Sequence, residues 1–309
     1  MTIKHLVISG GGHTLFQSLG TLYYLETNDY FKLDNIESIY GTSAGTIIAT
    51  CLALKFDWET LNDYIIQRPW KDVFKINIQN ILDVYKNRGI FDNTDIIKCF
   101  KPLFDAKDIP IDINLHDFYT LTKIELHFFT FEINEYKVED ISYLTHPNIE
   151  LVSAVHMSCS IPVLFKPVFI EDKCYIDGGI SCNYPLNYCI ESGKLPDEII
   201  GLKNNYYDSN FIINKECNVL QFLLNFIYKA LFSNNTDNKQ TTIINEVLCN
   251  SHIVSLDKLK EALYNVQNRK DLFEIGLNAG VNFLLNKTSN STKQTETETN
   301  LENSVQELL

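Results

Sequence analysis

The amino-acid sequence predicts a three-layer α/β/α domain with a mainly parallel central sheet, followed by a C-terminal helical extension. Three observations lead to this prediction. Short apolar strand patterns alternate with helical patterns to about residue 205. The first two strand patterns, residues 3–9 and 36–40, each lead through a glycine-containing turn into a helix. From about residue 211 only helical patterns remain. Because strands separated by helices pair in parallel, the first part of the chain reads as one layered α/β unit.

Length and charge restrict the class of protein. The chain has 309 residues, of which 45% are apolar, and this is enough for a large buried core. The net charge is -13 and the pI is about 5.0, so the chain lacks the basic footprint of a nucleic-acid-binding protein. An acidic chain has no general attraction to anionic lipid, so contact with a membrane would need a local patch.

The cysteines and the N-terminus bear on the cellular compartment. The eight cysteines are scattered, with no Cys-x-x-Cys pair and no Cys/His cluster of the spacing that binds zinc. This spacing gives no indication of a zinc site, and we expect reduced thiols. The N-terminus leads directly into a strand pattern, and no apolar run is long enough to span a bilayer. These features predict a cytoplasmic protein, with transient membrane association left open.

The first strand is followed by three glycines, Gly10, Gly11 and Gly12, and then by a helix pattern that begins at Leu15. Such a loop can offer bare backbone N–H groups to an oxyanion, bind a phosphate, or form a plain tight turn. The dinucleotide-binding fingerprint requires a glycine where Leu15 stands, and a Walker lysine is absent. The nucleotide-binding interpretation is therefore disfavoured.

The second strand ends in Gly41-Thr42-Ser43-Ala44-Gly45, and an apolar helix follows over residues 46–54. Gly-x-Ser-x-Gly is typical of a nucleophile elbow, a sharp turn that presents a serine hydroxyl at a sheet edge. Only one strand and one helix precede this elbow unit, which is too few for the usual α/β-hydrolase arrangement. Because the glycine loop and the elbow both follow parallel strands, we expect them at the same edge of the sheet.

The remaining patterns of the domain follow in order. We expect a helix capped by Asp57, a helix capped within 91–94, a loop over 105–117, a strand over 124–133 and a helix over 149–160. A short strand over residues 174–176 then leads into Asp177-Gly178-Gly179, and one more strand covers 199–202.

Asp177 is the better candidate for a base that activates Ser43. Only His252 follows Asp177 among the histidines, and it lies in a helical region without a turn signal. His13 directly follows the glycine loop, where its side chain could line the site or its N–H could serve the loop. Asp-Gly is also an ordinary turn dipeptide. An aspartate serves as a base only where burial raises its pKa from about 3.9.

Together these residues resemble the patatin-like phospholipase family. The resemblance rests on the glycine loop, the Gly41–Gly45 elbow and Asp177-Gly178-Gly179, in this order. Two further segments agree with it, the glycine-containing first helix at residues 19–22 and residues 158–167, which resemble the family's Ser-x-Pro-x-x-Phe-x-Pro segment. The resemblance covers about residues 3 to 205.

The resemblance implies a serine–aspartate dyad without histidine, in which Ser43 is the nucleophile and Asp177 activates it. It further implies an oxyanion hole from the loop of Gly10, Gly11, Gly12 and His13, mainly from Gly11 and Gly12, and structural support from Gly41, Gly45, Gly178 and Gly179. The implied substrate is a glycerophospholipid or another lipid acyl ester, cleaved through an acyl-enzyme without a metal or cofactor. This chain departs from the family at His13-Thr14-Leu15, where a basic residue followed by glycine is usual. The alternative interpretation is a catalytically silent lipid-binding or interaction protein that keeps the fold.

The composition divides the chain into three parts. We expect a patatin-like α/β domain over residues 1–210, a helical extension over 211–286 packed on it, and a disordered polar tail over 287–309. The strongly apolar stretch 219–232 is either a helix packed on the core, which we favour, or a lid that meets a membrane. Nothing in the sequence indicates an oligomeric state.

Overall fold

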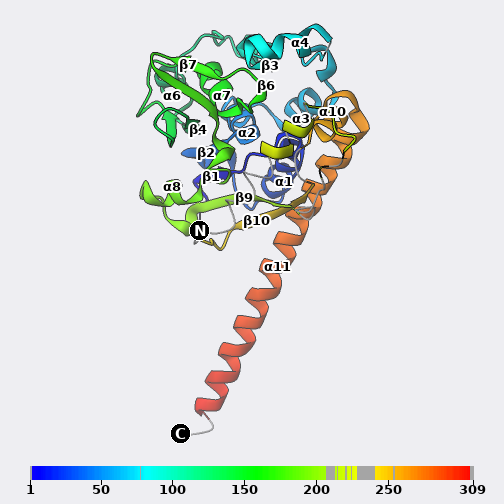
Figure 1. Ribbon diagram of the computed structural model, residues 1–309. Coiled ribbons are helices and arrows are strands. Elements are labelled where there is room, and N and C mark those ends of the chain that lie inside the picture. The colour runs from blue at the N-terminus through cyan, green and yellow to red at the C-terminus, as the bar shows by residue number, and fades with distance from the viewer. Residues whose placement is uncertain are drawn as a thin grey trace.

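The computed structural model describes residues 2–76, 78–206, 213, 215–219, 221–223, 225–227, 241–252 and 255–306. Figure 1 shows a twisted central sheet with most helices packed on one of its faces, and a long C-terminal helix that leaves the domain. Among the described helices, none combines the length and the apolar character that a membrane span requires.

The central sheet is mainly parallel, as predicted. Its strand order is β10-β9-β1-β2-β4-β8-β7, and β5 pairs with β4 off this path. The parallel strands are β1 (His5–Ile8), β2 (Ser38–Thr42), β4 (Glu125–Glu132), β9 (Ile199–Tyr206) and β10 (Glu246–Ser251). The antiparallel strands are β5 (Lys137–Ser142), β7 (Val168–Ile170) and β8 (Lys173–Asp177). A separate small sheet pairs β3 (Gly89–Phe91) with β6 (Val163–Phe165).

Alternate side chains of the strands divide the core into two layers. Leu6 and Ile8 of β1 point into the large cluster, whereas Val7 between them points into a smaller cluster with Leu186. The helices of the large layer and its surroundings are α1 (Leu15–Thr27), α2 (Ala44–Ala53), α3 (Trp58–Gln67), α4 (Ile78–Asn87), α5 (Asn93–Asp105), α6 (Leu115–Thr122), α7 (Leu151–Cys159), α10 (Leu256–Tyr264) and α11 (Val266–Gln306). The layer formed by the smaller cluster contains α8 (Leu186–Glu191).

Several helix starts follow the predicted capping chemistry. The Asp57 carboxylate accepts a hydrogen bond from the Thr60 N–H at the start of α3. Asp92 and Asp95 form a capping box at the start of α5. The loop expected over residues 105–117 is shorter than predicted, because the Asn114 side chain accepts a hydrogen bond from the Asp117 N–H and caps α6.

The C-terminal part differs from the predicted all-helical extension. β10 pairs in parallel with β9 and becomes an edge strand of the central sheet. Its buried residues Val247, Cys249 and Ser251 alternate with exposed ones such as Leu248, so a short amphipathic strand was hidden between helical patterns.

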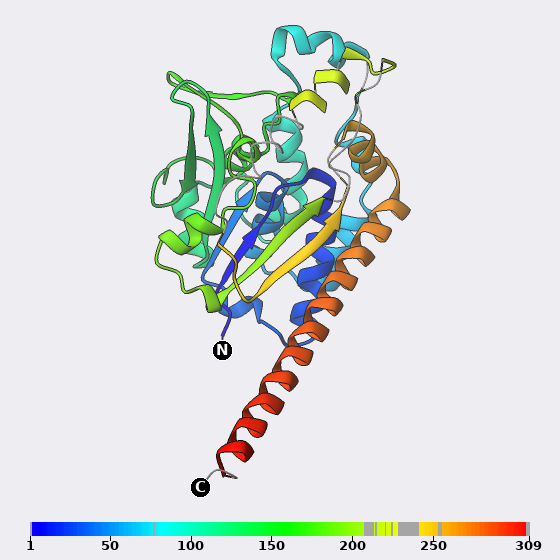
Figure 2. The same cartoon turned by 60° about the horizontal axis from the view of Figure 1, so that its bottom comes forward.

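The two long helices α1 and α11 lie side by side (Figures 1 and 2). A Cβ atom on Gly20 would lie 2.2 Å from the Phe273 carbonyl oxygen, and one on Gly276 would lie 2.0 Å from that of Gln17. Glycine at both positions therefore permits the close approach that docks the C-terminal helix on the domain.

The tail from residue 287 was predicted to be disordered, but α11 continues through it to Gln306. This end of the helix projects away from the domain (Figure 2). No glycine or proline follows Gly280, so nothing in the sequence interrupts the helix.

Half of the apolar stretch 219–232 lies outside the described residues. Its described side chains include Val219, Phe222 and Phe226, which are exposed. We had expected this stretch to pack on the core.

Candidate active site

Ser43 occupies a strained turn between β2 and α2. Its backbone has φ 52° and ψ −124°, a conformation that non-glycine residues rarely adopt. The Ser43 N–H donates to the Ser158 hydroxyl over 2.9 Å, and that hydroxyl donates to the Phe129 carbonyl over 2.5 Å. A Cβ atom on Gly45 would lie 2.4 Å from the Ile8 carbonyl oxygen. The elbow therefore requires this glycine and is held from the side by Ser158.

The Ser43 hydroxyl donates to the Asp177 carboxylate, with 2.6 Å between Oγ and Oδ2. Asp177 ends β8, and its second oxygen accepts a hydrogen bond of 2.7 Å from the Gly179 N–H. A Cβ atom on Gly178 would lie 2.2 Å from the Phe129 carbonyl oxygen, so glycine lets the turn pass close to β4. The structure thus brings together the serine and the aspartate that lie far apart in the sequence.

Burial sets the basicity of this carboxylate. Ser43 and Asp177 are each 5% exposed. Burial raises the pKa of Asp177 to about 7, although the hydrogen bonds from Ser43 and Gly179 act in the opposite direction. At neutral pH the carboxyl group is therefore poised between its ionised and protonated forms, as a general base requires.

The glycine loop lies against the elbow. A Cβ atom on Gly10 would lie 2.9 Å from the Ser43 Cβ. The Gly10 carbonyl accepts hydrogen bonds from Asn204 Nδ2 over 2.8 Å, Asn183 Nδ2 over 3.1 Å and the Tyr206 hydroxyl over 3.4 Å. Three side chains from β9 and the loop before α8 therefore fix the first peptide of the glycine loop.

The loop offers fewer donors than the sequence suggests. The Gly10 N–H donates to the Asn183 carbonyl over 3.0 Å, so Gly10 has no free N–H for an oxyanion, contrary to our expectation. In the described part of the chain, the N–H groups of Gly11, Gly12 and His13 have no acceptor. Gly12 has φ +56°, which favours glycine.

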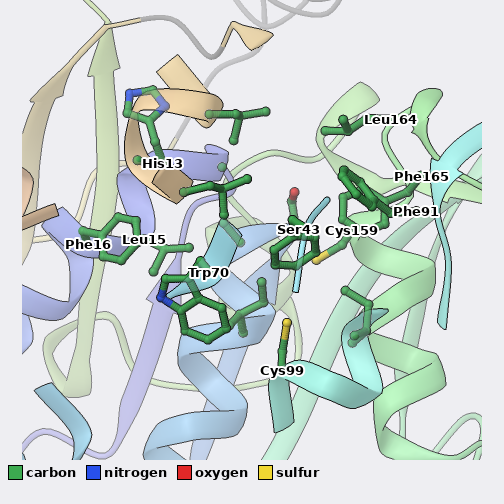
Figure 3. Close-up of a pocket in the computed structure, with 18 of the residues that line it drawn as sticks. His13, Leu15, Phe16, Ser43, Trp70, Phe91, Cys99, Cys159, Leu164 and Phe165 are labelled. Atoms are coloured by element: carbon green, nitrogen blue, oxygen red, sulfur yellow. The ribbon is translucent and has the colours of Figure 1, made fainter. Parts of the chain in front are cut away.

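The His13 side chain takes no part in the dyad. Its ring is buried and turned away from Ser43 (Figure 3), and Nε2 lies 3.4 Å from the Ser251 hydroxyl of β10. Burial lowers the pKa of His13 to about 4, so the ring is neutral at physiological pH. Its contribution to the loop is therefore limited to the backbone N–H and to contacts with β10.

An apolar cavity of about 130 Å³ opens beside Ser43 (Figure 3). Helices α1, α2, α3, α5, α7 and α10 and the small β3–β6 sheet all contribute to its walls. Its lining is almost entirely apolar and includes Leu15, Trp70, Phe91, Cys99, Leu164 and Phe165. Leu15, which departs from the family pattern, is thus a wall residue. Such a cavity suits an apolar chain attached to the atom that Ser43 attacks.

The cysteine thiols near Ser43 are poor candidates for a second nucleophile. Cys51, Cys99 and Cys159 line the same cavity, but burial raises the pKa of all three thiols, that of Cys51 to about 12. They therefore remain protonated and weakly nucleophilic. Among the described residues, no group of three or more His, Cys, Asp or Glu side chains is placed to hold a metal ion.

The sequence did not reveal every residue of this site. Ser158 lies in a segment that resembles the family, yet no pattern indicated that its hydroxyl would hold the Ser43 N–H. Asn183 and Asn204 have no local signature at all, because they reach Gly10 only through the sheet topology.

Comparisons with known proteins agree with the sequence resemblance. The family model described as patatin-like phospholipase matches residues 6–190. A probable lipid hydrolase, 463L of invertebrate iridescent virus 6, is 27% identical over 61% of this chain and 63% of its own length. The uncharacterized protein R571 of Acanthamoeba polyphaga mimivirus is 30% identical over 60% of each chain. The match therefore spans less than two thirds of these relatives. The crystal structure of VipD from Legionella pneumophila superposes with a TM-score of 0.48 and 17% identity, over 89% of this chain and 67% of that one.

Proposed function

Because the chain belongs to the patatin-like phospholipase family, we propose that it is a lipid acyl hydrolase in which Ser43 is the nucleophile and Asp177 the general base. The observation that supports this proposal most is the 2.6 Å hydrogen bond from Ser43 Oγ to a buried carboxylate whose pKa lies at about 7. The proposed substrate is an acyl ester of a glycerophospholipid, cleaved as a phospholipase A cleaves it. Fatty acid release from such a lipid, dependent on Ser43, is the test.

The proposed reaction proceeds in two halves. Ser43 Oγ attacks the ester carbonyl carbon while its proton passes to Asp177 Oδ2. When the tetrahedral intermediate collapses, Asp177 returns that proton to the leaving alcohol oxygen and the acyl group stays on Ser43. Water then attacks the acyl-enzyme and gives a proton to Asp177. Collapse of the second intermediate releases the fatty acid, and Ser43 Oγ regains the proton. No step in this scheme requires a metal or cofactor.

The oxyanion of each intermediate needs hydrogen-bond donors beside Ser43. We assign this role to the N–H groups of Gly11 and Gly12, which have no acceptor in the described residues, with the His13 N–H as a third candidate. In a trans peptide the C=O and N–H point in opposite directions. Since the Gly10 carbonyl is held by Asn183 and Asn204, the Gly11 N–H of the same peptide points away from these side chains.

Removal of the Asn204 side chain tests the role of its hydrogen bond to the Gly10 carbonyl. We expect Asn204→Ala to lower kcat on a soluble ester about tenfold, because the loop loses its shortest side-chain hydrogen bond at Gly10, while KM changes little. Asn205→Ala is the matched control, since Asn205 is exposed and bonds to Asn250 instead. Steady-state kinetics of both variants check the prediction. Equal kcat values for the two variants would show that the hydrogen bond from Asn204 to Gly10 does not support catalysis.

The apolar cavity predicts a preference for long acyl chains. We expect kcat/KM on soluble aryl esters to rise about threefold for each methylene added between acetate and octanoate, because each methylene leaves water for the cavity. Initial rates on a homologous ester series measure this dependence. A flat profile would show that the cavity does not bind the acyl chain.

A further inference from the structure

An exposed apolar surface lies on α4 and the neighbouring strand β7. Leu82 and Tyr85 of α4 are 66% and 98% exposed, and Phe169 and Ile170 of β7 are 56% and 37% exposed. The Arg88 guanidinium, just after α4, lies 5.4 Å from the centre of the Phe169 ring. This contact joins the two elements into one surface, which we call the α4 surface and define by these four apolar residues. Such a cluster of exposed large side chains usually marks an interaction site.

The segments on either side of α4 contribute to the cavity that adjoins Ser43. Phe74 and Ile76 precede α4 and Phe91 follows it, and all three line the cavity. Figure 2 shows α4 beyond the carboxyl ends of β1 and β9, on the same side of the sheet as α10. The described helical residues 219, 221–223 and 225–227 lie at this end as well, and Phe222 among them is exposed. The α4 surface and the active-site cavity therefore lie at the same end of the molecule.

The charge around the α4 surface differs from that of the whole chain. Residues 71–88 carry four basic and two acidic side chains, in a protein with a net charge of -13. Lys86 and Arg88 are exposed and follow closely after Tyr85. Basic residues beside exposed aromatic and aliphatic ones are typical of surfaces that enter an anionic lipid interface. Anionic lipid would repel the remaining, acidic surface of the protein. This repulsion would favour the orientation in which the α4 surface faces the bilayer.

We propose that the α4 surface docks on an anionic lipid bilayer and holds the cavity against it, so that an acyl chain passes from the bilayer toward Ser43. This inference rests on the proposed function, because a lipid substrate is what makes a bilayer the fitting occupant. A protein partner seated on the same residues would cover the approach to the cavity instead of supplying it.

Vesicle binding by the full-length protein tests the proposal. The vesicles contain ether-linked phosphatidylcholine with or without ether-linked phosphatidylglycerol, because ether lipids cannot be hydrolysed at an acyl ester. We expect Leu82→Ser combined with Tyr85→Ser to lower binding to the anionic vesicles at least about tenfold. Lys86→Gln combined with Arg88→Gln should lower it about fivefold per charge on anionic vesicles, with little change on phosphatidylcholine alone.

The control carries the same kind of change at the opposite end. Leu121 and Leu195 are 58% and 56% exposed and precede β4 and β9, so Leu121→Ser combined with Leu195→Ser should leave vesicle binding unchanged. Hydrolysis of a soluble ester should be unchanged in both double-serine variants, which also verifies that they are folded. Equal binding by the Leu82/Tyr85 variant and the unmutated protein would overturn the proposal.

The outcomes separate this inference from the proposed function. If the unmutated protein hydrolyses a soluble ester through Ser43 but does not bind anionic vesicles, the docking proposal fails and the proposed function stands. If vesicle binding depends on Leu82 and Tyr85 while no Ser43-dependent hydrolysis occurs, the docking proposal stands and the proposed function fails.

Discussion

Ser43→Ala is expected to lower kcat/KM on a soluble ester at least about 10⁴-fold and to abolish acyl release from phospholipid vesicles. The reason is that Ser43 Oγ forms the bond to the acyl group, and a methyl group cannot replace it. The remaining donors of the glycine loop and the cavity can still bind substrate, so KM should change far less than kcat. Ester hydrolysis and covalent labelling by a fluorophosphonate measure the loss.

Ser153→Ala is the matched control for this experiment. Ser153 lies on α7 and its hydroxyl bonds to Glu150, away from the dyad, so labelling and hydrolysis should persist. Equal hydrolysis by Ser43→Ala and the unmutated protein would refute the proposed nucleophile. If the unmutated protein binds lipid but neither hydrolyses ester nor reacts with fluorophosphonate, the catalytically silent lipid-binding protein is the correct interpretation.

The sequence could predict those parts of the site where two backbone segments pass close to each other and require a glycine. Gly45 lies against the Ile8 carbonyl and Gly178 against the Phe129 carbonyl, and in both places a side chain would collide. Such contacts leave a local glycine pattern next to the functional side chain. Ser43 and Asp177 were therefore recognisable although the structure joins them across 134 positions of sequence.

The parts that sequence could not predict depend on contacts between distant side chains. Asn204 reaches the Gly10 carbonyl only because β9 lies next to β1 in the sheet, and no local pattern records that pairing. The same topology explains the missed edge strand β10, which exposes Leu248 and buries Val247 and Cys249. The cavity walls were equally hidden, since six helices and a small sheet each contribute to them.

Asp177→Asn is expected to lower kcat/KM at least about 10³-fold, because an amide cannot take the Ser43 proton. The pH dependence of the unmutated protein follows from the same carboxyl group. Its pKa of about 7 means that the base is protonated below that pH and ionised above it. Activity should therefore rise with pH to a plateau, with a midpoint near pH 7. A midpoint near pH 4 would show that the pKa of the base is not raised in the folded protein.

The same substitution should stabilise the fold. The pKa of Asp177 is about 7 in the folded protein and 3.8 in its ordinary state, and this difference corresponds to about 4 kcal/mol. Because the folded-state pKa is raised, the carboxyl contributes stability below pH 3.8 that is lost as the pH rises through 7. The neutral amide side chain of the Asp177→Asn variant carries no such dependence. Its hydrogen-bonding groups can still serve Gly179 through the amide oxygen and Ser43 through the amide nitrogen.

We therefore expect the free energy of unfolding of Asp177→Asn to exceed that of the unmutated protein by up to about 4 kcal/mol above pH 7, and the gap to close toward pH 4. Urea unfolding across this pH range measures the gap. Asp172→Asn, which removes the same charge from an exposed position before β8, should show no comparable gap. If Asp177→Asn is less stable than the unmutated protein at pH 8, then burial does not strain the carboxylate. The basicity that the mechanism requires would then lack its physical cause.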